Sequence, residues 1–141
     1  MPACTFFGHR DAPSHIKPLL RAAIIELIER CAVDCFYVGK QGAFDAMVRS
    51  VFSELRPIYP GVRFYVVLER MPGKETNIID SEWTILPEGI ELAPPRFAIL
   101  KRNEWMLSAS DYAITYVVHS FGGAARFEEM AIKRGKTVVR L

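Results

Sequence analysis

The sequence predicts an α/β fold with a mainly parallel sheet, and three observations support this prediction. Short apolar runs typical of buried strands alternate with longer stretches whose apolar residues recur every three or four positions, as on one face of a helix. Strands that alternate with helices imply crossover connections, which join parallel strands. The runs are almost continuously apolar, as expected for a sheet that helices cover on both faces.

Five runs are expected to form strands. They are Ala3–Phe7, Asp34–Val38, Val62–Leu68, Asp111–Val118 and Thr137–Leu141. The first two end at Gly8 and Gly39, and the third is rich in the β-branched and aromatic residues that strands favour. The stretch from about 69 to 94 reads as irregular, and we expect a loop there with a short strand or helix near Trp83–Leu86.

Four helices are expected between these strands. They cover residues from about 15 to 31, from Gly42 to just before Pro57, from Pro95 to Ser108 and from about 124 to 134. Ser14 suits the N-cap of the first helix, where Pro18 is tolerated because it lies near the first turn. Gly135 is expected to end the last helix. This order of elements predicts a Rossmann-like three-layer sandwich with a mainly parallel, five-stranded sheet.

Length and composition fit a single globular domain over residues 1–141. The net charge of +2, without a basic run, does not favour binding to nucleic acid. The three cysteines form no disulfide or zinc-site pattern with the three histidines, which indicates reduced thiols. The amino terminus lacks a signal-peptide pattern, and no apolar run approaches the ~20 residues of a membrane span. We therefore expect a cytoplasmic protein that uses no membrane, metal or cofactor.

Glycine follows the predicted strands at three places that would share one edge of a parallel sheet. These places are Phe7–Arg10, Gly39–Gly42 and His119–Gly123. Glycine allows the backbone to approach a ligand, and the following helix offers free N–H groups and the positive end of its dipole. A phosphate group uses both the close approach of the backbone and the amino end of the helix. Strand-to-helix turns, however, need glycine whether or not a ligand binds. None of the three loops matches a Walker loop or the dinucleotide fingerprint.

Several short motifs occur in an order that resembles the SLOG superfamily, which is named for the SMF and lonely-guy (LOG) proteins. The opening Cys4–Arg10 is similar to the Gly-His-Arg start of small bacterial members. The loop Gly39–Asp45 is similar to their Gly-Gly-Ala-x-Gly-Phe-Asp loop, with Lys40 in place of the second glycine. Arg102–Met106 resembles their Arg-Asn-x-x-Met signature, and Gly122–Glu129 resembles the Gly-Gly-x-Gly-Thr-x-x-Glu segment of the lonely-guy enzymes.

The resemblance implies a Rossmann-like fold and a nucleotide or nucleotide-like ligand. Lonely-guy enzymes cleave the base from a nucleoside 5′-monophosphate with an arginine and a glutamate that match Arg102 and Glu129. The chain departs from them where Ala125 and Arg126 replace a glycine and a threonine, and where the loop before Gly122 is longer. These changes disfavour hydrolysis, although Arg126 could pair with phosphate directly. The resemblance also implies a homodimer or higher homo-oligomer.

The predicted function is binding of a nucleotide or nucleotide-derived small molecule at the carboxyl edge of the sheet, as a signal sensor or a sequestering protein. The alternative is a phosphoribohydrolase with Arg102 and Glu129 as catalytic residues, and a third interpretation is an interaction protein with an inactive pocket. The residues expected to bind the ligand are Gly8, His9, Arg10, Gly39, Lys40, Gly42, Asp45, Arg102, Asn103, Gly122, Gly123 and Arg126.

Structural roles compete with these functional ones. An acid such as Asp45 is favoured in the first turn of a helix by the helix dipole alone. Glu129 could simply pair with Lys133, four residues further along a helix. His119 is either a general base or an exposed loop histidine, and Trp105 fits the core or an interface better than a base-stacking surface.

Overall fold

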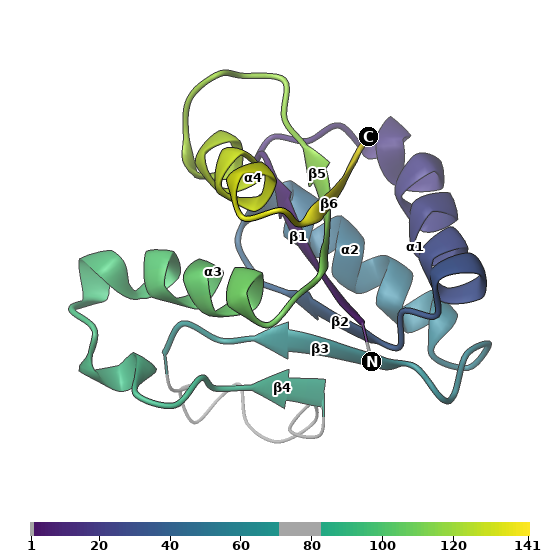
Figure 1. Cartoon of the computed structure of the whole chain (residues 1–141), viewed down its shortest axis with the longest axis horizontal. Coiled ribbons are helices and arrows are strands. Elements are labelled where there is room, and N and C mark those ends of the chain that lie inside the picture. The colour runs from purple at the N-terminus through teal and green to yellow at the C-terminus, as the bar shows by residue number, and fades with distance from the viewer. Residues whose placement is uncertain (1, 71–82) are drawn as a thin grey trace.

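The computed structural model describes residues 2–70 and 83–141 and shows one parallel sheet between two layers of helices (Figure 1). Within these residues, the strands are β1 Ala3–Gly8, β2 Cys35–Val38, β3 Arg63–Val67, β4 Thr84–Ile85, β5 Tyr112–Tyr116 and β6 Thr137–Arg140. The α-helices are α1 Lys17–Cys31, α2 Gly42–Leu55, α3 Ala98–Ser108 and α4 Gly123–Lys133. The predicted α/β fold with a parallel sheet is therefore confirmed.

The strand order in the sheet is β4-β3-β2-β1-β5-β6, and every neighbouring pair is parallel. The chain first adds strands on one side of β1 and then crosses to the other side, where β5 pairs with β1 along Cys4–Gly8. The sheet has six strands where five were predicted. The additional strand, β4, lies in the Trp83–Leu86 segment, where a short strand or helix was expected, and its two residues are too few to show a period.

Each face of the sheet packs on its own apolar cluster. On the face of α1 and α2, the buried rings of Phe6, Phe36, Phe52 and Phe64 pack together, with centroids 4.9–6.3 Å apart. On the face of α3 and α4, Phe7 stacks on Phe127 at 5.1 Å, beside Met106 and Leu107. These two clusters hold the helices in register with the strands and so fix the loops at the strand ends.

The helix starts differ from two predictions. Ser14 does not cap α1, because Ser14–Ile16 forms a 3₁₀ turn and α1 begins at Lys17 without a side-chain cap. Pro95–Phe97 is also a 3₁₀ turn, so α3 begins at Ala98. Pro18 does lie in the first turn of α1, and Gly135 takes a φ of +74° just after α4, as predicted. Across the described residues, no helix has the length and apolar character that spanning a membrane requires.

Candidate functional site

A cavity of about 590 Å³ opens at the carboxyl edge of the sheet, between the loops that follow β1 and β5. This is the point where the strand order reverses direction, which is where ligands bind in open α/β sheets. The cavity brings together many of the predicted site residues: Gly8, His9, Arg10, Asp45, Arg102, Asn103, Gly122 and Gly123. The β2–α2 loop and α3 complete its wall.

Three of the predicted glycines are packed closely against other groups of the protein. A Cβ on Gly8 would lie 2.2 Å from the ring of Phe44, and a Cβ on Gly39 would lie 2.5 Å from the guanidinium carbon of Arg102. Gly42 has a φ of +79°, and its Cβ would lie 2.7 Å from the backbone of Arg10. These glycines therefore have a packing role within the protein, and Gly8 also lines the cavity.

Arg102 extends from α3 into the centre of this packing and is only 2% exposed. Its Nε and Nη2 donate to Oδ1 of Asn103 at 3.2 and 3.0 Å, and its Nη1 lies 3.5 Å from Oε2 of Glu69. Burial lowers the pKa of Arg102, while the carboxylates of Asp45 and Glu69 oppose that change. The guanidinium lines the cavity but is already engaged by groups of the protein.

The side chain of Asp45, in the first turn of α2, binds the backbone at the amino end of that helix. Its Oδ2 accepts the backbone N–H of Gln41 at 2.9 Å, and the N–H of Ala43 donates to the carbonyl of Arg10 at 2.8 Å. Burial raises the pKa of Asp45, while the hydrogen bond from Gln41 and the nearby guanidinium groups, Arg102 first, oppose that rise. Backbone groups at the start of α2 are thus already paired within the protein, which limits their use for a ligand.

The amino end of α4 is open by contrast. Gly122 takes a φ of +93° at the N-cap, and no side chain caps the helix. Neither Gly122 nor Gly123 has a heavy atom within 4 Å of the position of a Cβ, and both line the cavity together with Ala124. The residues that supply the first N–H groups of α4, at the positive end of its dipole, therefore lie at the cavity, and such a helix end suits an anion.

His9 holds the loop between β5 and α4 in place. Its Nε2 accepts the backbone N–H groups of Val118 and His119 at 2.9 and 3.1 Å. An accepting Nε2 requires the neutral imidazole with its proton on Nδ1. Burial lowers the pKa of His9, and the adjacent His119 lowers it further. The role found for His9 is thus to bind backbone, and these bonds explain why β5 stops at Tyr116 instead of reaching Val118.

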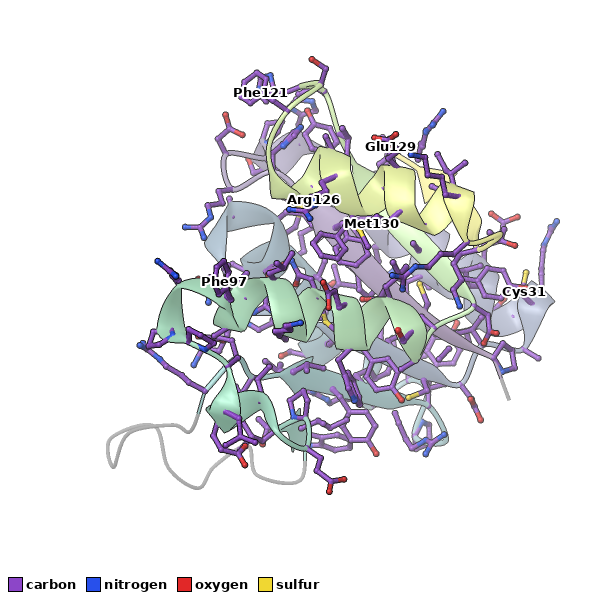
Figure 2. All side chains as sticks on the ribbon, turned by 60° about the vertical axis from the view of Figure 1, so that its left-hand side comes forward. Cys31, Phe97, Phe121, Arg126, Glu129 and Met130 are labelled. Atoms are coloured by element: carbon purple, nitrogen blue, oxygen red, sulfur yellow. The ribbon has the colours of Figure 1, made fainter. Side chains whose placement is uncertain are left out.

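The other predicted residues do not line the cavity. These are Gly39, Lys40, Gly42, Arg126 and Glu129. Glu129 is 67% exposed and pairs with Lys133 at 3.1 Å on the outer face of α4, where Figure 2 shows it. Its neighbour Glu128 accepts a hydrogen bond from Thr115 and lies 3.6 Å from Nε of Arg140.

The cavity also contains residues that were not predicted from the sequence to bind the ligand. Gln41, Ile99, Met106 and Phe121 line it, and so does His119, which the sequence offered as either a base or a loop residue. For Phe121 a signal existed, since it is an aromatic residue inside a glycine-containing loop. Ile99 and Met106 lie one helical turn from Arg102 and Asn103, and only the placement of α3 shows that they line this cavity.

Among residues 2–70 and 83–141, no group of three or more His, Cys, Asp or Glu side chains is arranged to hold a metal ion. The charged groups of the cavity are instead Arg10, Asp11, Asp45 and Arg102. This arrangement suits hydrogen bonding and charge pairing with a polar small molecule. The sequence matches no protein-family model and no curated protein.

Proposed function

We propose that the protein binds a nucleotide or nucleotide-derived small molecule in the cavity between the β1 and β5 loops. The observation that carries this proposal is the open amino end of α4 at the reversal point of the strand order. A volume of about 590 Å³ falls within the range of small-molecule sites. A ligand with an anionic group and a larger polar body matches both features.

We assign the phosphate to two positive features of the cavity that remain accessible. The N–H groups at Gly123 and Ala124 begin α4, and the exposed side chain of Arg10 lies on the loop after β1. Arg102 is less suited to this task because Asn103 and Glu69 already occupy its guanidinium. We therefore assign phosphate contact to α4 and Arg10, and support of the cavity wall to Arg102.

Binding without turnover fits the geometry better than hydrolysis of a nucleoside monophosphate. General acid–base catalysis needs a side chain within hydrogen-bond reach of the reacting group. Glu129, the carboxylate that the lonely-guy resemblance points to, lies outside the cavity and pairs with Lys133. We expect that incubation with nucleoside 5′-monophosphates releases no base above background. Release that Glu129→Gln abolishes would instead establish the hydrolase.

The binding proposal is tested with two variants at one position. Gly123→Asp places a carboxylate in the first turn of α4, where it favours the helix but repels an anion. Gly123→Ala adds only a methyl group, for which the structure has room. Wild type and Gly123→Ala are expected to gain thermal stability from a nucleotide in a panel of mono-, di- and cyclic nucleotides and ADP-ribose, by about 2.7 kcal/mol at a hundredfold excess over Kd.

Gly123→Asp is expected to keep the melting temperature of the free protein while losing most of this ligand-induced gain. Thermal unfolding with and without each nucleotide measures both quantities. If no member of the panel stabilises the wild type, or if Gly123→Asp responds as strongly as Gly123→Ala, the proposed site is wrong.

A further inference from the structure

Three aromatic rings form a continuous series from the interior of the cavity to its rim. The rings of His9 and His119 have centroids 4.6 Å apart, and the ring of His119 stacks on Phe121 at 5.2 Å with an interplanar angle of 22°. All three side chains line the cavity. Exposure increases along the series, from the buried His9 to Phe121, which is 72% exposed.

The position of Phe121 at the outer end of this series is not explained by core packing. Its side chain projects from the loop before α4, at the top of Figure 2, and contributes to neither apolar cluster of the sheet. A phenylalanine that remains largely in water forgoes the free energy that its burial would provide. One ring face meets His119, so a planar partner can still cover exposed surface of Phe121.

The ring series is held rigidly at its inner end. His9 accepts two backbone N–H groups from the same loop, at Val118 and His119. This anchoring reduces the conformational entropy that the loop would lose when a ligand stacks on it. Phe121 is also the direct chain neighbour of Gly122, so its Cα lies about 3.8 Å from the Cα of the α4 N-cap.

We infer that Phe121 is a stacking surface for the aromatic base of a nucleoside phosphate whose phosphate binds at the amino end of α4. This inference rests on the proposed function and specifies its ligand class. One loop then contacts both ends of a nucleoside monophosphate: the N–H groups of α4 meet the phosphate, and Phe121 meets the base. Purines are favoured over pyrimidines, because their larger ring system covers more of Phe121.

The test compares a ligand that carries a base with one that lacks it. Adenosine 5′-monophosphate and ribose 5-phosphate are titrated calorimetrically into wild type, Phe121→Ala, Phe121→Trp and the control Phe97→Ala. Phe97 is also an exposed phenylalanine, 41% accessible, but does not line the cavity. Base stacking on an aromatic side chain contributes ~1–3 kcal/mol, which corresponds to about a 5- to 150-fold change in Kd.

Phe121→Ala is expected to weaken adenosine 5′-monophosphate binding by at least about fivefold. Its affinity for ribose 5-phosphate should change by less than about twofold, because that ligand cannot stack. Phe121→Trp should bind the nucleotide with about the affinity of wild type, and Phe97→Ala should bind both ligands as wild type does. This pattern separates stacking from a general loosening of the loop, which would weaken both ligands equally.

Three results overturn the stacking surface while the proposed function stands. One is wild-type affinity of Phe121→Ala for adenosine 5′-monophosphate, and the second is an equal loss of affinity for both ligands. The third is a change in the sedimentation of Phe121→Ala, which would make Phe121 part of an interface between copies of the chain. If the wild type binds neither compound nor any other member of the nucleotide panel, the proposed function fails, and the stacking surface fails with it.

Discussion

The imidazole of His9 functions as a hydrogen-bond acceptor, and this makes it sensitive to protonation. Its Nε2 receives the N–H groups of Val118 and His119, so a proton on that atom would remove both bonds. Burial lowers the pKa of His9 and His119 adds to this effect, while the carboxylates of Asp11 and Glu128 oppose it. The folded protein therefore binds this proton less readily than the unfolded chain, in which a histidine has a pKa of about 6.5.

We predict that the free energy of unfolding decreases as the pH falls, because His9 becomes protonated. Its contribution is fully present above about pH 6.5 and is lost as the pH falls through the lowered pKa, at about 1.4 kcal/mol per unit of pKa difference. Urea unfolding of wild type, His9→Gln and His15→Gln between about pH 7 and pH 5 measures this effect. A glutamine at position 9 can accept hydrogen bonds but does not titrate, so His9→Gln should lose that part of the pH dependence. His15 is exposed, and His15→Gln should keep it. An unchanged pH dependence in His9→Gln would refute the assignment.

Among the elements, the loops after β1 and β2 are packed against one another and against α2 and α3. Phe44 of α2 fills the space beside Gly8, and Arg102 of α3 fills the space beside Gly39. The backbone bond from Ala43 to Arg10 joins the two loops directly. These contacts give the cavity wall its shape before any ligand is present, so the wall depends on small residues at two strand ends.

We predict that Gly8→Ala destabilises the protein by about 1–3 kcal/mol, because its Cβ would lie 2.2 Å from the Phe44 ring. Gly61→Ala is the matched control, since nothing lies within 4 Å of its Cβ, and its effect should stay within about 1 kcal/mol. Denaturant unfolding of Gly8→Ala, Phe44→Leu and the double variant gives the coupling between the two positions. Additive effects would show that the ring is not the cause.

At the scale of the whole molecule, four phenylalanines join the central strands to α2. Phe36 lies on β2 with its ring 6.1 Å from Phe6, 6.3 Å from Phe52 and 5.4 Å from Phe64, and it is fully buried. Because each ring contacts several others, the loss of one leaves a void that its neighbours cannot fill without moving.

We predict that Phe36→Ala lowers the free energy of unfolding by about 3–5 kcal/mol, a large part of the stability of an ordinary domain. Phe121→Ala, which removes a ring of the same size from the surface, should change stability by no more than about 0.5 kcal/mol. Chemical denaturation of both variants checks this contrast. A small loss for Phe36→Ala would mean that the cluster can repack.

The periodicity of the sequence was sufficient to predict the α/β fold, the four helices and all strands but one. For the Trp83–Leu86 segment the pattern left a short strand or a helix open, because the two residues of β4 are too few to show a period. It also did not show the 3₁₀ turns that displace the starts of α1 and α3. The glycine loops were located correctly at one edge, but their packing partners are distant in sequence, as with Gly8 and Phe44. The exposed side of α4 that carries Glu129 likewise depends on how that helix sits on the sheet.

Assembly of several copies of the chain stays a prediction from the resemblance alone. Large apolar side chains that remain exposed, such as Leu19, Ile58, Leu92 and Ile132, are distributed over different elements. Exposed apolar residues of this kind also occur singly on monomeric proteins, so they do not indicate an interface.

The position of β1 beside both β2 and β5 has a consequence for synthesis on the ribosome. Strand β1 is made first and can pair with β2 early, but β5 and α4 leave the ribosome only after about a hundred further residues. Until then the backbone of β1 lacks its second neighbour and the hollow lacks the wall that carries Gly122 and Gly123. A nascent or truncated chain that ends before Tyr112 therefore holds four of the six described strands and no enclosed hollow, so any binding capacity arises late, together with closure of the fold.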